Sequence, residues 1–285
     1  MKCLVNEDLS KYTTVRIGGT AKKMFVPENE DELLKVIEEE NPKYFIGGGS
    51  NLLIDEDSFD TVVNLRNFNT QITELGDGLF SVGASVRLQK LITTINEKGF
   101  GGMEYLFSVP GLVGGAVVMN AGRGKKANKC ISDYIVNVRV LENGKILELK
   151  KEECDFSYRN SRFKNGNAIV LSVLFKFPSC GKDEAEKLRK ERIEHCKKVQ
   201  DNSAPNFGSV FSSSSMTIMK LVKKIGIRSG GCRFSGKTVN WILNTDNGTY
   251  ADASKCIRKV QRLHRLCGKK CKLEVILWEG SKNKE

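Results

Sequence analysis

The sequence lacks any apolar run that approaches the ~18 residues needed for a transmembrane helix. Its first residues, MKCLVNEDLSKY, also lack the apolar core of a secretory signal peptide. With 40% hydrophobic and 28% charged residues, the composition is that of an ordinary globular chain. We therefore expect a soluble, cytoplasmic protein that does not insert into a membrane.

The sequence also has little that could hold a metal ion or a disulfide framework. It contains two histidines, and its nine cysteines are scattered without a C-x-x-C pair. Because their number is odd, we expect reduced and mostly structural thiols. Cys267 and Cys271 lie close to His264, but no second pair of ligands accompanies them, so no metal site is predicted.

The chain is basic: it has 46 Lys and Arg residues and 34 Asp and Glu residues, which gives a net charge of +12. The basic residues recur in many segments, and aromatic side chains are not interleaved with them as they are in nucleic-acid-binding proteins. We interpret the excess as a solvated basic face and expect no nucleic-acid partner. Such a charge also attracts small polyanions, for example a nucleotide diphosphate.

The chain of 285 residues is long for a single hydrophobic core, and its pattern changes along its length. We expect helices near 86–98, 182–200, 216–225 and 251–267, and strands that include 135–141, 146–149, 168–177 and the terminal LEVILW. An earlier helix follows the polar stretch PENEDE. These elements predict an α+β protein in three parts, 1–70, 71–180 and 181–285.

A run of three glycines in FIGGGSNLL separates two short apolar segments. Gly47, Gly48 and Gly49 can adopt positive φ and let another group approach the backbone closely. Together with Ser50 and Asn51, the N–H groups of such a loop form a concave site for a phosphate or pyrophosphate. A tight hairpin or bulge is the alternative, and the loop is neither a G-x-G-x-x-G fingerprint nor a Walker loop.

A second segment with exposed backbone is SVPGLVGGAVVMNAG, where three glycines interrupt an apolar run. Small residues in a close-packed helix would explain it by themselves. Next to the first loop, it offers a second surface for a long, flat, phosphate-bearing cofactor.

Seven motifs now stand in order: TTVRIGGTA, FIGGGSNLL, SVPGLVGGAVVMNAG, DFSYRNSRF, NFGSVF, GKTVNWILN and KLEVILWEG. They span nearly the whole chain and resemble the UDP-N-acetylenolpyruvoylglucosamine reductases of bacterial cell-wall synthesis, in the shorter of the two family types. The resemblance implies non-covalent FAD, NADPH as co-substrate, a UDP-sugar substrate and a monomeric protein. It also implies a two-part FAD-binding region of the vanillyl-alcohol-oxidase-like type, 1–70 and 71–180, followed by an α+β substrate domain, 181–285.

The same resemblance implies the site residues. Those expected to hold FAD are Gly47, Gly48, Gly49, Ser50, Asn51, Ser108, Pro110, Gly111, Gly114, Gly115 and Asn120. Those expected to be catalytic are Arg159, Ser209 and Glu274, and those expected to bind substrate are Tyr158, Arg159, Lys237 and Asn240. Without the resemblance, Arg159 would be interpreted as part of a surface ion pair and Glu274 as the polar side of a half-buried strand.

The sequence departs from the family pattern in three places. Ser212–Ser215 replace the Lys-Asn-Pro that usually follows Phe211, and Arg123–Lys126 replace an Ala-Tyr-Gly and an acid. Thr238 also stands where the family often has His. The alternatives are another flavoprotein of this fold acting on a small alcohol or hydroxy acid, and a nucleic-acid-binding or interaction protein that uses the positive charge.

Overall fold

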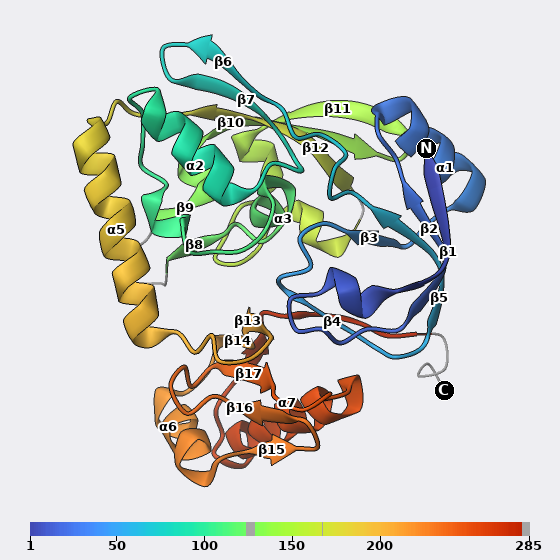
Figure 1. Ribbon diagram of the computed structural model, residues 1–285, viewed down its shortest axis with the longest axis vertical. Helices are drawn as coiled ribbons and strands as arrows, with labels where there is room; N and C mark the ends of the chain where they lie inside the picture. Colours follow the sequence, from blue (N-terminus) through green and yellow to red (C-terminus); the bar gives the residue numbers. More distant parts are fainter. Residues whose placement is uncertain (124–128, 167, 281–285) are drawn as a thin grey trace. The chain divides into compact units, whose positions relative to one another are not determined.

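The computed structural model describes residues 1–123, 129–166 and 168–280. The chain divides into two compact units and crosses between them several times (Figure 1). The first unit comprises 1–3, 25–47 and 63–196, and the second comprises 4–24, 48–62 and 197–285. The boundaries at 70 and 180 that the sequence suggested remain predictions.

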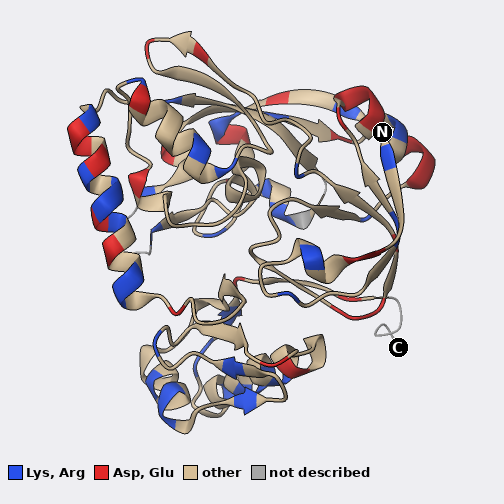
Figure 2. Ribbon diagram, viewed as in Figure 1, with Lys and Arg blue, Asp and Glu red and all other residues tan. Residues whose placement is uncertain are grey.

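The predicted charged helix at 182–200 is confirmed as α5 (Lys182–Val199). Only Ala185 and Cys196 of this helix are buried. Figure 2 shows acidic and basic residues alternating along it, and Lys190 forms an ion pair of 2.6 Å with Glu186 one turn earlier. Pairs of this kind stabilise a solvated helix by only a few tenths of a kcal/mol each, so its long polar face is ordinary surface.

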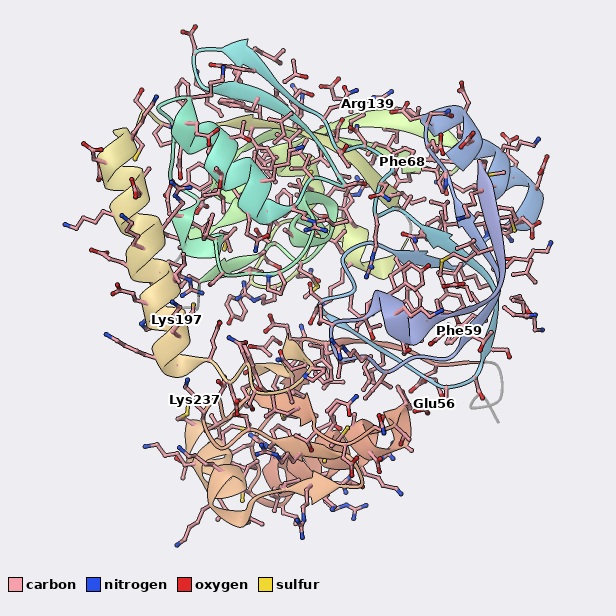
Figure 3. The ribbon with its side chains drawn as sticks, viewed as in Figure 1. Glu56, Phe59, Phe68, Arg139, Lys197 and Lys237 are labelled. Carbon is pink, nitrogen blue, oxygen red and sulfur yellow. The ribbon has the colours of Figure 1, made fainter. Side chains whose placement is uncertain are left out.

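The second unit is built from both ends of the chain. Its strands are β1 (Lys2–Asp8), β2 (Thr20–Val26), β4 (Leu52–Ile54), β5 (Ser58–Asn64), β13 (Asn206–Ser209), β14 (Phe211–Ser213), β15 (Arg228–Ser229), β16 (Cys232–Phe234), β17 (Trp241–Asn244), β18 (Lys272–Leu273) and β19 (Ile276–Trp278). One antiparallel sheet has the order β13-β17-β16-β15, and β19 pairs parallel with β4. Phe59 of β5, labelled in Figure 3, packs against Trp278 with ring centroids 6.1 Å apart.

Two helices complete the second unit, α6 (Met216–Ile225) and α7 (Tyr250–Leu266), and both match the predicted ranges within one residue. Helix α7 begins with a capping box, in which the Asp252 N–H donates to Thr249 Oγ1 and the Thr249 N–H donates to the Asp252 carboxylate. Helix α6 ends at Gly226, whose φ of 68° suits glycine. The buried sides of both helices share one hydrophobic core with Phe207, Phe211 and Phe234.

The first unit is built on a five-stranded antiparallel sheet with the order β11-β10-β12-β7-β6. Its elements are α1 (Glu30–Glu40), β3 (Tyr44–Ile46), β6 (Ile72–Gly76), β7 (Leu79–Gly83), α2 (Leu88–Glu97), α3 (Val113–Val118), β8 (Gly122–Arg123), β9 (Lys129–Cys130), β10 (Ile135–Glu142), β11 (Lys145–Lys150), β12 (Ala168–Lys176) and α5. Asn143 and Gly144, both at positive φ, form the predicted two-residue turn between β10 and β11. The predicted helix at 86–98 is confirmed as α2.

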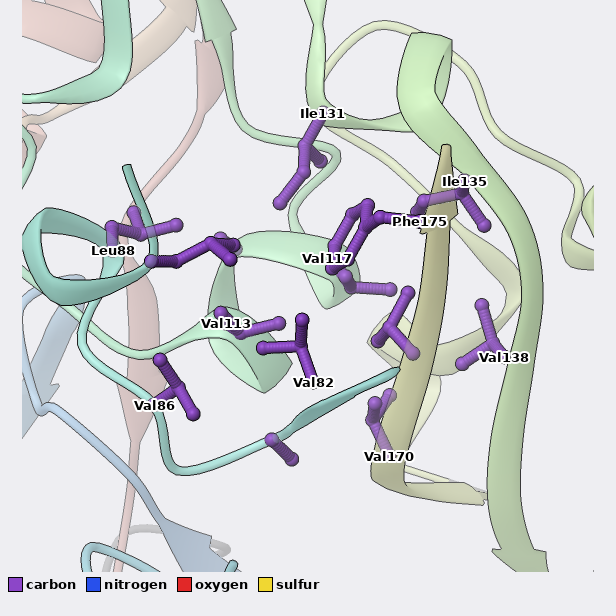
Figure 4. Packing of buried hydrophobic residues seen from close by; sticks show 14 of the residues in the cluster. Val82, Val86, Leu88, Val113, Val117, Ile131, Ile135, Val138, Val170 and Phe175 are labelled. Atoms are coloured by element: carbon purple, nitrogen blue, oxygen red, sulfur yellow. The ribbon is translucent and has the colours of Figure 1, made fainter. Parts of the chain in front are cut away.

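The core of the first unit lies between this sheet and the helices α2 and α3. Figure 4 shows Val82 of β7, Leu88 of α2, Val113 and Val117 of α3 and Val170 of β12 packing in one cluster. The small residues of α3 allow it to approach the chain just after β7, where the Gly114 N–H donates to the Ala84 carbonyl at 2.8 Å. The second glycine-rich segment is therefore partly a close-packed helix, as the simpler interpretation held.

One predicted strand is interrupted. LEVILW forms two short strands, β18 and β19, with Glu274 and Val275 between them. The N–H groups of Glu274 and Val275 both point to the carbonyl of Val210, at 2.8 and 3.4 Å. The shared acceptor replaces regular pairing at these two residues, so the chain changes partner strand from β14 to β4 across Glu274.

Candidate functional site

Ser209 is the last residue of β13, where the regular pairing of this strand with β17 ends. The pairing of β13 with β17 shifts register between Asn206 and Ser209, which marks a bulge. Gly208 adopts a φ of +75°, and its N–H donates to Asn206 Oδ1 at 3.0 Å. Bulges change the direction in which a side chain points, and this one leaves the Ser209 side chain half-buried rather than in the core.

Asn240 fixes the backbone that follows Ser209. Its carbonyl accepts the Val210 N–H at 2.9 Å, its Oδ1 accepts the Phe211 N–H at 3.1 Å, and its Nδ2 donates to the Phe211 carbonyl at 2.8 Å. Both ends of the carboxamide therefore bind main chain. The substrate contact implied for Asn240 remains a prediction, and the observed contacts define a positioning role that the sequence did not reveal.

Glu274 lies on the other side of the same segment. The hydrogen bond from its N–H to the Val210 carbonyl joins it to the residue that directly follows Ser209. Its own carbonyl accepts Asn51 Nδ2 at 3.1 Å, and the Ile276 N–H donates to the Asn51 carbonyl at 3.0 Å. The second unit thus brings together Ser209, Asn240, Glu274 and Asn51 of the GGGSN loop.

Within that loop, the glycines serve different purposes. Gly49 has a φ of +63°, and a Cβ there would lie 1.8 Å from the Tyr12 carbonyl oxygen, so packing alone requires glycine. Gly47, in the first unit, accepts Arg66 Nε on its carbonyl at 3.0 Å. A Cβ on Gly47 would make only an ordinary contact of 3.5 Å with Leu112 Cδ1. The cofactor roles of Gly47, Gly48, Gly49 and Ser50 remain predictions.

The second glycine-rich segment, in the first unit, also contains one open position. A Cβ on Gly114 would lie 3.0 Å from Ala84 Cβ, whereas one on Gly115 would meet nothing within 4 Å. Gly111 has a φ of +137° and accepts the Leu88 N–H on its carbonyl at 3.2 Å. The backbone beside Gly115 therefore has room for a bound group, which fits the predicted cofactor role.

Ser108 is engaged by the protein itself. Its hydroxyl accepts Arg192 Nε at 2.8 Å and lies 3.0 Å from Cys196 Sγ, both on α5. Pro110, two residues later, is exposed. Contacts of Ser108 and Pro110 with a cofactor remain predictions.

Tyr158 and Arg159 form the tip of a tight turn in the first unit. Ser157 and Asn160 exchange two backbone hydrogen bonds of 3.0 and 3.1 Å across the turn, and Arg159 takes a φ of +55°. A left-handed conformation of a non-glycine residue is strained and is common at functional sites. The Arg159 guanidinium donates to the Gly122 carbonyl at 2.6 Å and lies 5.4 Å from the centre of the Tyr158 ring.

Asn120 holds this turn in place. It is buried, and its Nδ2 donates to the Ser157 carbonyl at 3.0 Å while its Oδ1 accepts the Ser132 N–H at 3.4 Å. Asn120, Tyr158 and Arg159 are therefore neighbours within the first unit. The sequence suggested a cofactor contact for Asn120, which remains a prediction. The departure at Gly124–Lys126 lies outside the described residues.

Lys237 lies at the end of α5. Its Nζ donates to the Lys197 carbonyl at 2.7 Å, and the neighbouring Thr238 hydroxyl donates to the Val199 carbonyl at 2.8 Å; Figure 3 labels Lys197 and Lys237. These bonds satisfy carbonyls of the last helical turn, where a cation is favoured. Binding of substrate by Lys237 remains a prediction.

Four of the nine cysteines, Cys154, Cys196, Cys232 and Cys256, are buried. All nine cysteines are free, and burial raises the pKa of the Cys271 thiol to about 11. The described residues contain no group of three or more potential metal ligands. They also contain no helix of sufficient length and apolarity to cross a membrane.

Two comparisons with known proteins agree with this architecture. Residues 21–150 match a family model described as FAD binding domain. A solved structure of UDP-N-acetylenolpyruvylglucosamine reductase from Thermus caldophilus superposes with a TM-score of 0.80, covering 98% of each chain at 27% identity. The α+β fold with an FAD-binding region is thereby confirmed, and the protein is an FAD-dependent oxidoreductase by class.

Curated relatives identify the family within that class. A UDP-N-acetylenolpyruvoylglucosamine reductase from Fusobacterium nucleatum is 31% identical over 92% of this chain and 94% of its own. The enzyme of that name from Carboxydothermus hydrogenoformans is 34% identical over 91% of this chain and 88% of its own. The chain belongs to the UDP-N-acetylenolpyruvoylglucosamine reductase family, which confirms the resemblance seen in its seven motifs.

Proposed function

We propose that this protein uses FAD and NADPH to reduce UDP-N-acetylenolpyruvoylglucosamine to UDP-N-acetylmuramate, a step of peptidoglycan precursor synthesis. One observation carries the proposal beyond family membership. Ser209 and Glu274, far apart in the sequence, are joined through the single carbonyl of Val210. The two residues that the family pattern marks as catalytic in the second unit are therefore held in adjacent segments joined by a backbone hydrogen bond.

FAD fits the residues available to it. Room beside the Gly115 backbone and the small side chains of the GGGSN loop are what a flat cofactor with a pyrophosphate requires. Once bound and reduced by NADPH, the flavin would supply the hydride for the β-carbon of the enol ether. The protein must then stabilise negative charge on the substrate carboxylate and deliver a proton to the α-carbon.

Ser209 is the proposed proton donor. The reaction adds a hydride to one carbon of the double bond and a proton to the other, so atoms and charge balance when the serine hydroxyl gives up its proton. A serine is a weak acid, and it acts only if its position is fixed and nearby charge stabilises the alkoxide left behind. The bulge at Gly208 and the contacts of Asn240 with Val210 and Phe211 fix that position.

Arg159 is proposed to bind the substrate carboxylate. A guanidinium can donate two parallel hydrogen bonds to a carboxylate, which a lysine ammonium cannot do as well. The strained turn and the Asn120 side chain hold Arg159 before substrate arrives, which supports this role. Glu274 is proposed to act with Arg159 in polarising that carboxylate as charge develops on it.

The finer features of the proposal are NADPH as reductant, a monomeric state and a cytoplasmic location. They rest on the family resemblance. We expect no role for nucleic acid in the reaction.

The test is oxidation of NADPH by purified, flavin-loaded protein, measured with and without UDP-N-acetylenolpyruvoylglucosamine. The expected result is oxidation that depends on the UDP-sugar and yields UDP-N-acetylmuramate, by protein whose flavin is extractable after denaturation. A yellow protein that does not reduce the UDP-sugar but oxidises small alcohols or hydroxy acids would refute the proposal.

A further inference from the structure

Helix α7 of the second unit has an outer face on which every charged side chain is basic. Its exposed positions recur at helical spacing and include Lys255, Arg258, Lys259, Arg262 and Arg265. The acidic residue of the helix, Asp252, lies in the first turn and is used by the capping box. We call these five residues the α7 stripe.

The α7 stripe is not neutralised by the protein. Among the described residues, Lys255, Arg258, Arg262 and Arg265 form no ion pair, and Lys259 donates to the carbonyl of Arg228 at 3.0 Å. Helix α5 offers the contrast, because its basic side chains alternate with acidic ones (Figure 2). The two long helices thus differ in charge pattern, because α5 carries both signs and the outer face of α7 is basic. Only α7 is suited to a polyanion.

The stripe belongs to a larger asymmetry in how charge is distributed along the chain. Residues 202–280 contain fourteen Lys or Arg residues and four Asp or Glu residues. This stretch therefore carries ten of the twelve net positive charges of the chain. A field of that size and single sign attracts anionic partners from solution.

Exposed apolar side chains accompany the cations. Leu266 ends α7 one turn after Arg262 and is 77% exposed. On α6, which packs against α7, Leu221 and Ile225 are 44% and 58% exposed and lie beside Lys220 and Lys224. Cations combined with exposed aliphatic side chains on one helix are typical of surfaces that dock on anionic membranes.

The alternatives fit less well. Single-stranded nucleic acid is bound by exposed aromatic side chains on which bases stack, whereas the phenylalanines, Tyr250 and Trp278 of this stretch are buried and Trp241 is half-buried. A second copy of the chain would place one basic stripe against another. Nucleic acid would also leave the exposed leucine and isoleucine side chains in water.

We propose that the α7 stripe, with Leu266 and the exposed face of α6, docks the protein reversibly on an anionic phospholipid surface. The docking is peripheral and adds to the proposed catalytic function without depending on it. Each Lys or Arg close to such a surface raises the partition coefficient roughly five-fold, so three of them contribute about 100-fold. The attraction falls as salt shortens the screening length.

The test is flotation of the FAD-loaded, full-length protein with vesicles. One set contains phosphatidylcholine alone, and the other contains equal amounts of phosphatidylcholine and phosphatidylglycerol. We expect binding to the anionic vesicles only, and a loss of about 100-fold in the triple variant Arg258→Gln, Arg262→Gln, Arg265→Gln. The matched control is Lys182→Gln, Lys187→Gln, Lys198→Gln on α5, which removes the same charge and should bind like the unaltered protein.

Two further measurements complete the test. Leu266→Ser should weaken binding to anionic vesicles at every salt concentration, because it removes an apolar contact rather than a charge. Substrate-dependent NADPH oxidation in solution should be unchanged in all these variants, which shows that they fold. The proposal is wrong if anionic vesicles are not bound at low salt, if the α7 and α5 triple variants lose binding equally, or if duplex DNA is bound and vesicles are not.

Discussion

The side-chain amide of Asn51 donates a hydrogen bond of 3.1 Å to the carbonyl oxygen of Glu274. This bond ties the loop predicted to receive the cofactor pyrophosphate to the residue predicted to act on the substrate carboxylate. Ile276 returns the contact through its N–H to the Asn51 carbonyl at 3.0 Å. Within the second unit, the loop predicted to hold the cofactor and the segment predicted to be catalytic are therefore joined by hydrogen bonds.

Replacing Asn51 by Ala should loosen that assembly. The lost hydrogen bond costs about 1 kcal/mol of stability, and the Glu274 carbonyl loses a partner. We expect slower reoxidation of the reduced protein by the UDP-sugar, with a smaller effect on its reduction by NADPH. Stopped-flow measurement of the two half-reactions checks this, and an equal effect on both would assign Asn51 to the cofactor alone.

Gly49 and Gly115 should respond differently to the same substitution. Gly49→Ala forces a Cβ to within 1.8 Å of the Tyr12 carbonyl in a left-handed conformation, so we expect a loss of stability of at least about 1–2 kcal/mol. Gly115→Ala meets no atom within 4 Å and should not lower the stability of the flavin-free protein, because alanine is favoured over glycine within helix α3, while it weakens FAD binding. Thermal unfolding and flavin titration separate the two effects. Retention of full FAD affinity by Gly115→Ala would remove that residue from the cofactor site.

Asn240 permits a choice between two roles. If it positions Ser209 through Val210 and Phe211, Asn240→Ala leaves two backbone groups without partners and lowers kcat, with little change in KM. If it binds the UDP-sugar directly, KM rises instead. We expect the first result, with Asn240→Asp intermediate because it keeps the acceptor for the Phe211 N–H. Steady-state kinetics with varied UDP-sugar decide the matter, and a rise in KM alone would restore the substrate contact implied by the family pattern.

Much of the local structure could be predicted because it is encoded locally. Helix α6 matches its predicted range, since Ile218, Met219 and Val222 form one apolar stripe and Gly226 supplies the left-handed residue that ends it. The turn between β10 and β11 follows from the Asn-Gly pair alone. The family motifs predicted the FAD cofactor, which no single glycine run could have established.

The roles of other residues depend on partners far away in the sequence and could not be predicted. His264 was considered only as a metal ligand, yet it is buried, its Nε2 accepts the Ser215 N–H at 3.0 Å, and its Nδ1 lies 2.9 Å from the Val260 carbonyl. A backbone N–H can only donate, so the histidine proton lies on Nδ1, and His264 joins α7 to the start of α6. Likewise, nothing near Asn240 in the sequence indicates Phe211 as its partner.

Measuring reduction by NADPH and reoxidation by the UDP-sugar separately also tests the proposed role of Ser209 as proton donor. Ser209→Ala removes the proton donor but no group expected to contact NADPH. We expect unchanged reduction by NADPH and reoxidation by the UDP-sugar that is slower by about 10²–10⁴-fold, the usual contribution of a positioned acid. Ser209→Cys, which retains a proton at the same position, should recover part of the rate. If Ser209→Ala slowed both half-reactions alike, the defect would lie in binding or folding.

The final prediction concerns Ser212, which stands where the family usually has lysine. Its hydroxyl lies 3.3 and 3.2 Å from the carbonyls of Lys272 and Leu273, directly before Glu274, so this position is close to the proposed catalytic segment. A charge-assisted contact with the substrate diphosphate contributes about 1.5–3 kcal/mol, against about 0.5–1.5 kcal/mol for a neutral hydroxyl. Ser212→Lys should therefore lower KM for the UDP-sugar by about 10-fold, since 1.4 kcal/mol corresponds to that factor.

The matched control for Ser212→Lys is Ser213→Lys. Ser213 is exposed and neighbours Ser212 in β14, so its side chain points to the opposite face of the strand. The control adds the same charge and should leave KM unchanged, and reduction by NADPH should be normal in both variants. Lys237, a cation predicted to bind substrate, already donates to the Lys197 carbonyl. An unchanged KM in Ser212→Lys would show that another cation already contacts the substrate diphosphate or that the serine run lies away from it. An equal decrease of KM in both variants would indicate general electrostatic attraction.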